Sequence, residues 1–177
     1  MCMMESNDGK KPFTAAIVTL SDKGSRGERE DKSGPMIASI LKEFGGYEVV
    51  EYLLLPDGLE PLETELKRLA DEVQVNVVFT TGGTGFSVRD VTPEATIAVC
   101  DRMANGIAEA IRAYSMTITN RAMLSRAVSG IRKRTLIINM PGSPKAVREA
   151  LEFVLPSLGH GLGILCGTEG ECGGSAQ

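Results

Sequence analysis

Residues 80–94, TTGGTGFSVRDVTPE, combine the groups that bind a phosphate and a metal ion. Glycines at the end of a strand let the backbone turn tightly and present bare N–H groups to an anion, which Gly82–Gly85 could do. Asp90 adds a carboxylate, and Thr92 and Pro93 are predicted as the N-cap and first residue of a helix with a positive N-terminus. The segment favours a phosphate-and-metal site. The alternative is a tight strand-to-helix turn without a ligand.

Two other carboxylates follow apolar runs. Asp22 follows the run 14–20 and a serine, and Asp57 follows the run 47–55 and a proline. In an open parallel sheet ligands bind beyond the carboxyl ends of the strands, so both side chains are expected on the same edge as Asp90. Carboxylates beside phosphate-binding loops suit Mg²⁺, a hard cation that takes oxygen ligands. Each aspartate could instead be a turn residue, as Asp often is.

Two more segments belong to this expected edge. Pro141–Ser143 forms a second glycine-bearing loop, and Lys145 follows it at a predicted helix start. Ser125 and Arg126 precede a predicted hairpin, and an arginine near an anion site can hold a phosphate with two parallel hydrogen bonds. Solvated surface side chains are the alternative for Lys145 and Arg126. His160 is interpreted as structural.

These residues must be positioned by a sheet. Strand-like runs alternate with helical patterns, which favours an α/β fold with a mostly parallel sheet covered on both faces. The pair 127–131 and 135–140 flanks a short basic turn and is expected to form a hairpin. The predicted strands are 14–20, 47–55, 75–79, 127–131 and 135–140, and the predicted helices are 33–44, 59–72, 93–103, 105–116 and 146–158.

Length and composition restrict the class of protein. The 177 residues favour one domain, expected at 13–165, between a disordered N-terminal segment 1–12 and a flexible glycine-rich tail 166–177. A net charge of −4 argues against nucleic acid, which needs clustered cations. No apolar run reaches the about 20 residues that span a membrane, and no export signal is seen, so a cytoplasmic location is expected. The 4 cysteines match no zinc pattern and are interpreted as free thiols.

The sequence resembles the molybdopterin adenylyltransferases, the family of the bacterial MogA and MoaB proteins, the gephyrin G domain and its plant counterpart. The resemblance extends from about Ala15 to Leu158. It is carried by several motifs in the same order and spacing, namely Ser21-Asp22, DKSGP (31–35), Pro56-Asp57, TTGGTGFSVRDVTPEAT (80–96), AMLSRAVSGIR (122–132) and TLIINMPGSPKAV (135–147).

The resemblance implies a fold and an activity. The fold would be the molybdopterin-binding, MogA-like three-layer αβα sandwich, usually a homotrimer. The activity would be the Mg²⁺-dependent transfer of AMP from ATP to the terminal phosphate of molybdopterin, with release of pyrophosphate. The implied partner is the molybdenum or tungsten insertase that acts downstream.

The resemblance also implies roles for residues. Asp57 and Asp90 would be catalytic and would hold Mg²⁺. Backbone donors for nucleotide phosphates would come from Gly82, Gly83, Thr84 and Gly85. The nucleotide pocket would be lined by Ser21, Asp22, Pro141, Gly142 and Ser143, and the pterin side by Thr92, Ser125 and Arg126. Two alternatives remain, a non-catalytic protein that binds or delivers molybdopterin, and a scaffold role as in the gephyrin fusion. The intact RDVTPE stretch favours the enzyme.

Overall fold

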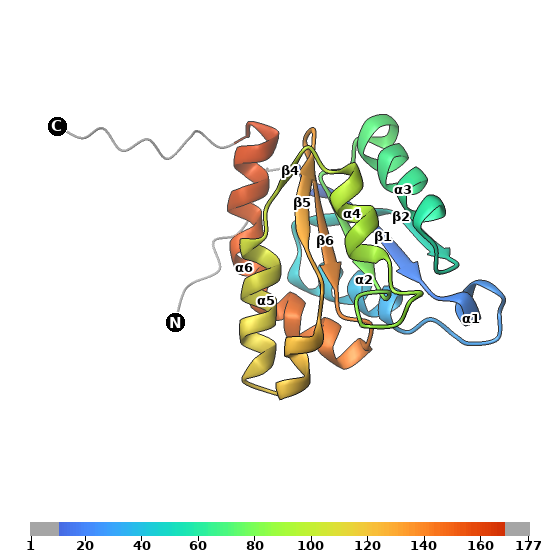
Figure 1. Cartoon of the computed structure of the whole chain (residues 1–177). Coiled ribbons are helices and arrows are strands. Elements are labelled where there is room, and N and C mark those ends of the chain that lie inside the picture. Colours follow the sequence, from blue (N-terminus) through green and yellow to red (C-terminus); the bar gives the residue numbers. More distant parts are fainter. Residues whose placement is uncertain (1–10, 169–177) are drawn as a thin grey trace.

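A six-stranded sheet forms the middle of the molecule (Figure 1). The computed structural model describes residues 11–168. Four neighbouring strands, β2, β1, β3 and β6, are parallel, and β5 and β4 continue the sheet in antiparallel fashion. The strand order is β2-β1-β3-β6-β5-β4, with bounds β1 Phe13–Leu20, β2 Tyr47–Leu55, β3 Val77–Thr81, β4 Arg102–Met103, β5 Ser129–Arg132 and β6 Thr135–Met140.

Helices cover both faces of this sheet. The helices are α1 Asp22–Ser25, α2 Ser33–Phe44, α3 Leu59–Arg68, a π-helical turn η1 Leu69–Val73, α4 Thr92–Val99, α5 Gly106–Met116, a 3₁₀ turn η2 Asn120–Leu124 and α6 Pro144–Cys166. Side chains alternate across each strand, so that Ile17 packs with α2 and α6 while Val18 packs with α3 and α4. Two apolar cores result, one on each face. The expected three-layer α/β sandwich is therefore confirmed.

Several predicted elements match closely. The predicted helix 33–44 and strand 47–55 have the bounds of α2 and β2, and the predicted hairpin is the antiparallel pair β5–β6. Gly45 ends α2 with φ +79°, a conformation that glycine adopts without strain.

Other boundaries were wrong. The helix predicted at 93–103 ends at Val99, because the chain then becomes extended and Arg102–Met103 pairs with β5 as an edge strand. The strand predicted at 75–79 is β3, two residues later. The helix predicted at 59–72 is α-helical only to Arg68 and continues as the π turn. The N-cap of α4 is Val91, so Thr92 is not the cap but lies inside the helix.

The last helix is longer than predicted. α6 extends from Pro144 to Cys166, eight residues beyond the predicted end at 158 and into the start of the predicted tail. Residues 1–10 and 169–177, which hold Cys2 and Cys172 and most of the predicted terminal segments, lie outside the described residues. Cys100 and Cys166 are free thiols, as expected. Between residues 11 and 168, no helix has the length and apolar character that crossing a bilayer requires.

Candidate functional site

A pocket of about 570 Å³ opens at the carboxyl edge of the parallel strands. Its walls come from the ends of β1 and β3, the segment before α2 and the loop between β6 and α6. Four predicted residues, Ser21, Gly82, Gly142 and Ser143, line it, and the other lining residues are Thr19, Leu20, Gly24, Arg29, Glu30, Asp31, Lys32, Ser33, Thr81 and Pro144. The segment 29–33 was not predicted as part of the site, although the DKSGP motif overlaps it and could have indicated it.

Asp31 organises that unpredicted wall. Its Oδ1 accepts the Ser33 N–H at 2.9 Å, and its Oδ2 accepts the hydroxyls of Thr19 at 2.7 Å and Tyr52 at 2.5 Å. Burial alone would raise the pKa of the Asp31 carboxyl, but these hydrogen bonds outweigh it and leave the pKa below the ordinary value. A Cβ on Gly34 would collide with Tyr52 and Asp31, which explains the glycine of the motif.

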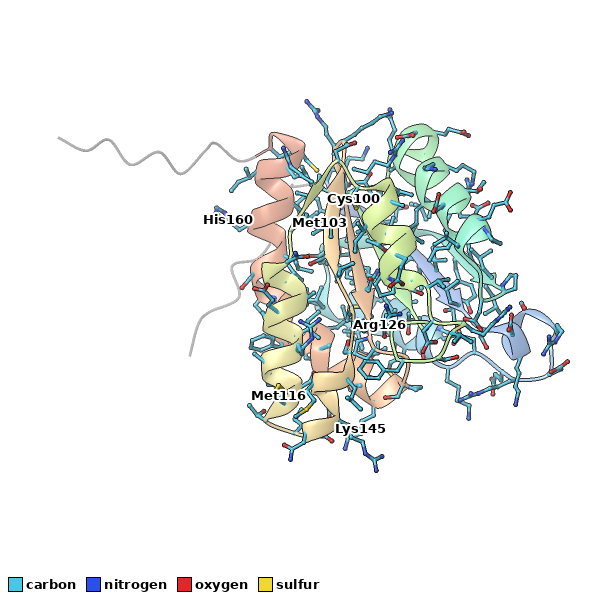
Figure 2. The ribbon with its side chains drawn as sticks, viewed as in Figure 1. Cys100, Met103, Met116, Arg126, Lys145 and His160 are labelled. Carbon is cyan, nitrogen blue, oxygen red and sulfur yellow. The ribbon has the colours of Figure 1, made fainter. Side chains whose placement is uncertain are left out.

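The loop between β6 and α6 closes the pocket on the other side. The Ser33 hydroxyl donates to the Gly142 carbonyl at 2.9 Å, and the Thr81 hydroxyl donates to the Pro141 carbonyl at 2.6 Å. Ser143 is the N-cap of α6, with its Oγ accepting the Ala146 N–H at 3.3 Å. Lys145 points outward in Figure 2 with its side chain 83% exposed, so it does not line the pocket.

The glycine loop after β3 is a tight turn that requires glycine at positions 82 and 83. Gly82 has φ +95°, and a Cβ there would lie 2.4 Å from the Leu20 carbonyl oxygen. Gly83 has φ +66°, and a Cβ there would lie 2.4 Å from Thr92 Oγ1. The tight-turn interpretation therefore holds for the backbone, and at Gly82 the same turn also lines the pocket. The Thr92 side chain is buried and donates to the Gly82 carbonyl at 2.8 Å.

Asp22 and Asp57 meet directly at one end of this edge. The Asp22 N–H donates to Asp57 Oδ2 at 2.9 Å, and the Asp57 N–H donates to Asp22 Oδ1 at 3.1 Å. Arg89 joins them: its Nη2 donates to both carboxylate oxygens of Asp22, at 2.8 and 2.7 Å, and to the Asp57 carbonyl at 2.7 Å. Arg89 was not predicted as a site residue, and its place directly before Asp90 was the signal for it.

The Asp90 carboxylate lies within its own turn. Its Oδ2 accepts the Ser87 N–H at 2.9 Å, and a Cβ on Gly85 would lie 2.9 Å from the same oxygen. Within the part of the chain that the structure describes, no three His, Cys, Asp or Glu side chains form a metal cluster. The oxygen donors of Asp22, Asp57 and Asp90 suit Mg²⁺ chemically, but substrate oxygens or water would have to complete the coordination.

Arg126, labelled in Figure 2, contacts the glycine loop through its side chain. Its guanidinium donates to the Gly85 carbonyl at 2.7 Å, to the Asp90 carbonyl at 2.5 Å and to the Glu94 carboxylate. Ser125 accepts the Ala127 N–H at 3.3 Å. Arg126 also lines a smaller pocket of about 180 Å³, together with Asn105, Ala108, Glu109, Arg112, Ala127 and Val128.

A buried polar network supports the glycine loop from below. Asn139, which is fully buried, accepts the Val128 N–H at 3.1 Å and donates to the hydroxyls of Thr80 and Thr96 at 2.9 Å each. Thr96 in turn donates to the Thr92 carbonyl at 2.9 Å. The network links β3, β6 and α4, and the sequence pattern did not predict it.

Comparisons with known proteins agree with the motifs. Residues 16–160 match the family model described as "Probable molybdopterin binding domain". The molybdopterin adenylyltransferase of Helicobacter pylori (strain J99) is 40% identical over 152 residues, which cover 85% of this chain and 86% of that protein. Gephyrin of Dictyostelium discoideum is 40% identical over 172 residues, 91% of this chain and 24% of that protein. The molybdopterin biosynthesis enzyme MoaB from Thermus thermophilus superposes with a TM-score of 0.83 at 46% identity, covering 88% of this chain and 97% of that chain.

Proposed function

The chain belongs to the family of molybdopterin-binding domains, and we propose that it is a molybdopterin adenylyltransferase of molybdenum cofactor biosynthesis. The observation that carries this proposal is that the large pocket lies next to the acidic edge, the part of the sheet edge that holds Asp22, Asp57 and Asp90. Ser21, which lines the pocket, directly precedes Asp22, and Asp22 is bonded to Asp57. A nucleotide in the pocket would then have its phosphates directed toward carboxylates that suit a hard cation.

The reaction is a nucleophilic substitution at the α-phosphorus of ATP. An oxygen of the terminal phosphate of molybdopterin forms a bond to the α-phosphorus of ATP, the bond from that phosphorus to the bridging oxygen breaks, and pyrophosphate leaves with the electron pair. Both reactants are anions, so positioning and electrostatic stabilisation must supply most of the rate. The attacking phosphate is already largely ionised at neutral pH, so no general base is needed.

This chain's residues divide that work. The pocket offers Arg29, Lys32 and the Ser33 region to bind and orient the nucleotide. Asp57 and Asp90 are proposed to hold Mg²⁺ through their carboxylate oxygens, with Asp22 beside them. When bound, Mg²⁺ would supply positive charge that reduces the repulsion the attacking phosphate meets. The backbone of Gly82–Gly85 is proposed to donate to phosphate, and Ser125 to lie toward the pterin.

Assembly and cellular context extend the proposal. We expect a homotrimer in the cytoplasm, with a molybdenum or tungsten insertase as the downstream partner. Exposed apolar side chains on α5, on η2 and on the link between them support self-association, because an exposed apolar patch often marks an interaction site. They are Met116, Ile118, Met123 and Leu124.

Incubation with molybdopterin, ATP and Mg²⁺ tests the activity, with pyrophosphate release as the readout. Asp57→Asn and Asp90→Asn should each abolish turnover while molybdopterin binding is retained, because each removes a charged oxygen ligand and keeps the shape. Asp101→Asn, on the loop between α4 and β4, is the matched control and should leave turnover unchanged. Near-normal turnover in Asp90→Asn would refute the metal-ligand role. Molybdopterin binding without any pyrophosphate from the unmodified protein would favour the alternative, a protein that binds or delivers molybdopterin.

A further inference from the structure

We propose that Arg126 is a positioning residue, which fixes the turn 85–90 from outside and so sets the direction of the Asp90 carboxylate. The proposal rests on the proposed function for the role of Asp90, but the geometry of the turn stands independently of it. Arg126 does not touch the pocket that holds the nucleotide in the proposed function.

The contacts of Arg126 reach both ends of the turn. Its Nε donates to the Gly85 carbonyl at 2.7 Å, and its Nη2 donates to the Asp90 carbonyl at 2.5 Å. Its backbone N–H donates to the Thr84 carbonyl at 2.9 Å. A planar guanidinium with fixed donor directions can hold two carbonyls at a set separation, which an ammonium cannot do.

The turn has little apolar packing to define its shape. Phe86, Ser87, Val88 and Arg89 are exposed, Val88 at 95%, so apolar packing contributes little to holding them. Inside the turn the Asp90 N–H donates to the Ser87 carbonyl at 2.9 Å, and the Asp90 carboxylate accepts the Ser87 N–H. The turn is therefore anchored on two sides, by Arg89 to Asp22 and Asp57 through an exposed side chain and by Arg126 to its two ends.

Glu94 holds the guanidinium in place. The Glu94 carboxylate, in the first turn of α4, is ion-paired with Nη1 of Arg126. Hydrogen bonding from Arg126 lowers the pKa of Glu94 below its ordinary value. With Nε, Nη1 and Nη2 all bonded to protein acceptors, the guanidinium is committed to the loop, which speaks against its use as a phosphate clamp.

The test is Arg126→Lys, which keeps the positive charge and removes the fixed donor directions of the guanidinium. The Mg²⁺ concentration for half-maximal adenylylation should rise by about 10- to 100-fold, the effect typical of residues that orient a metal ligand. The KM for molybdopterin should change less than about twofold. Arg132→Lys is the matched control. Arg132 donates to the Asp71 carboxylate and to the Val99 carbonyl, both outside the turn. The Mg²⁺ dependence of this variant should therefore match that of the unmodified protein.

Amide hydrogen exchange provides a readout without substrate. Exchange at residues 86–90 should accelerate in Arg126→Lys and stay unchanged in Arg132→Lys. Unchanged exchange together with unchanged Mg²⁺ dependence would overturn the proposal, and so would a rise in the KM for molybdopterin alone. If the unmodified protein releases no pyrophosphate, the proposed function fails, and the exchange experiment still decides whether Arg126 holds the turn.

Discussion

Gly83→Ala should destabilise the fold mainly through one neighbour, the hydroxyl of Thr92. A Cβ at position 83 would lie 2.4 Å from Thr92 Oγ1, well inside van der Waals contact. Thr92 is only 1% exposed, so its side chain cannot move out into solvent. The least costly response is rotation of the Thr92 side chain, which breaks its hydrogen bond to the Gly82 carbonyl.

The cost has two parts. Position 83 has φ +66°, and a left-handed conformation costs an L-residue roughly 1–2 kcal/mol. Breaking this hydrogen bond leaves the buried Thr92 hydroxyl without its acceptor and costs about 1–3 kcal/mol. Gly83→Ala should therefore lose about 2–5 kcal/mol of unfolding free energy, the sum of these estimates. Gly27→Ala, at φ +74° with nothing within 4 Å of the new Cβ, should lose only the first part and is the matched control.

A double-mutant cycle isolates the contact. Thr92→Ala alone removes the same hydrogen bond and should cost about 1–3 kcal/mol, but in the Gly83→Ala background it should cost almost nothing. The expected coupling is thus about as large as the hydrogen bond. Urea unfolding followed by far-UV circular dichroism measures all four proteins, at one protein concentration because association adds to apparent stability. Additive single effects, or equal losses for Gly83→Ala and Gly27→Ala, would refute the reasoning.

Two further predictions concern other polar contacts. Asn139→Ala should lower the unfolding free energy by about 2–4 kcal/mol, because it strands the Val128 N–H and removes the donor to two buried hydroxyls; a urea midpoint within error of the unmodified protein would contradict this. Hydrogen bonds from Arg132 and Lys133 lower the pKa of Asp71 from 3.8 to about 2. A folded-state pKa below the unfolded value stabilises the fold above about pH 4, and that contribution is lost as the pH falls toward 2. Asp71→Asn should therefore be less stable than the unmodified protein at pH 7, and the urea midpoints of the two proteins should become equal near pH 2. A difference between the midpoints that does not change with pH would exclude the ion pair of Asp71 with Arg132 as a source of acid sensitivity.

The sequence predicted those elements whose boundaries have local causes. The strand β2 and the helix α2 were found with their bounds because glycines and prolines punctuate them and apolar side chains repeat with the right period. β4 gave no such signal: Arg102 and Met103 are exposed, and their strand exists only through pairing with β5. The prediction for α6 ended too early because Gly159, Gly161 and Gly163 indicate a loop. Leu158 and Leu162 are buried, however, and this tertiary packing overrides the local preference.

The site residues also divide into those with a local signal in the sequence and those without one. Asp22 and Asp57 could be predicted because each comes two residues after a strand, and parallel strands bring their ends to one edge. The roles of arginines could not, because a long side chain reaches partners that sequence position does not reveal. Arg89 bonds Asp22, 67 residues away in the chain, and Arg126 bonds Gly85, 41 residues away.

The two arginines have a consequence for the charge of the acidic edge. Asp22, Asp57, Asp90 and Glu94 carry four negative charges, and Arg89 and Arg126 return two positive charges, so the group retains a net charge of −2. This residual charge equals what a divalent cation neutralises, and a third arginine here would remove half of it. The segment before α2 lines the pocket with two cations, Arg29 and Lys32, and with two carboxylates, Glu30 and Asp31. In the proposed function, phosphates bound in the pocket would meet Arg29 and Lys32, and a cation held by Asp57 and Asp90 would supply further positive charge beside them.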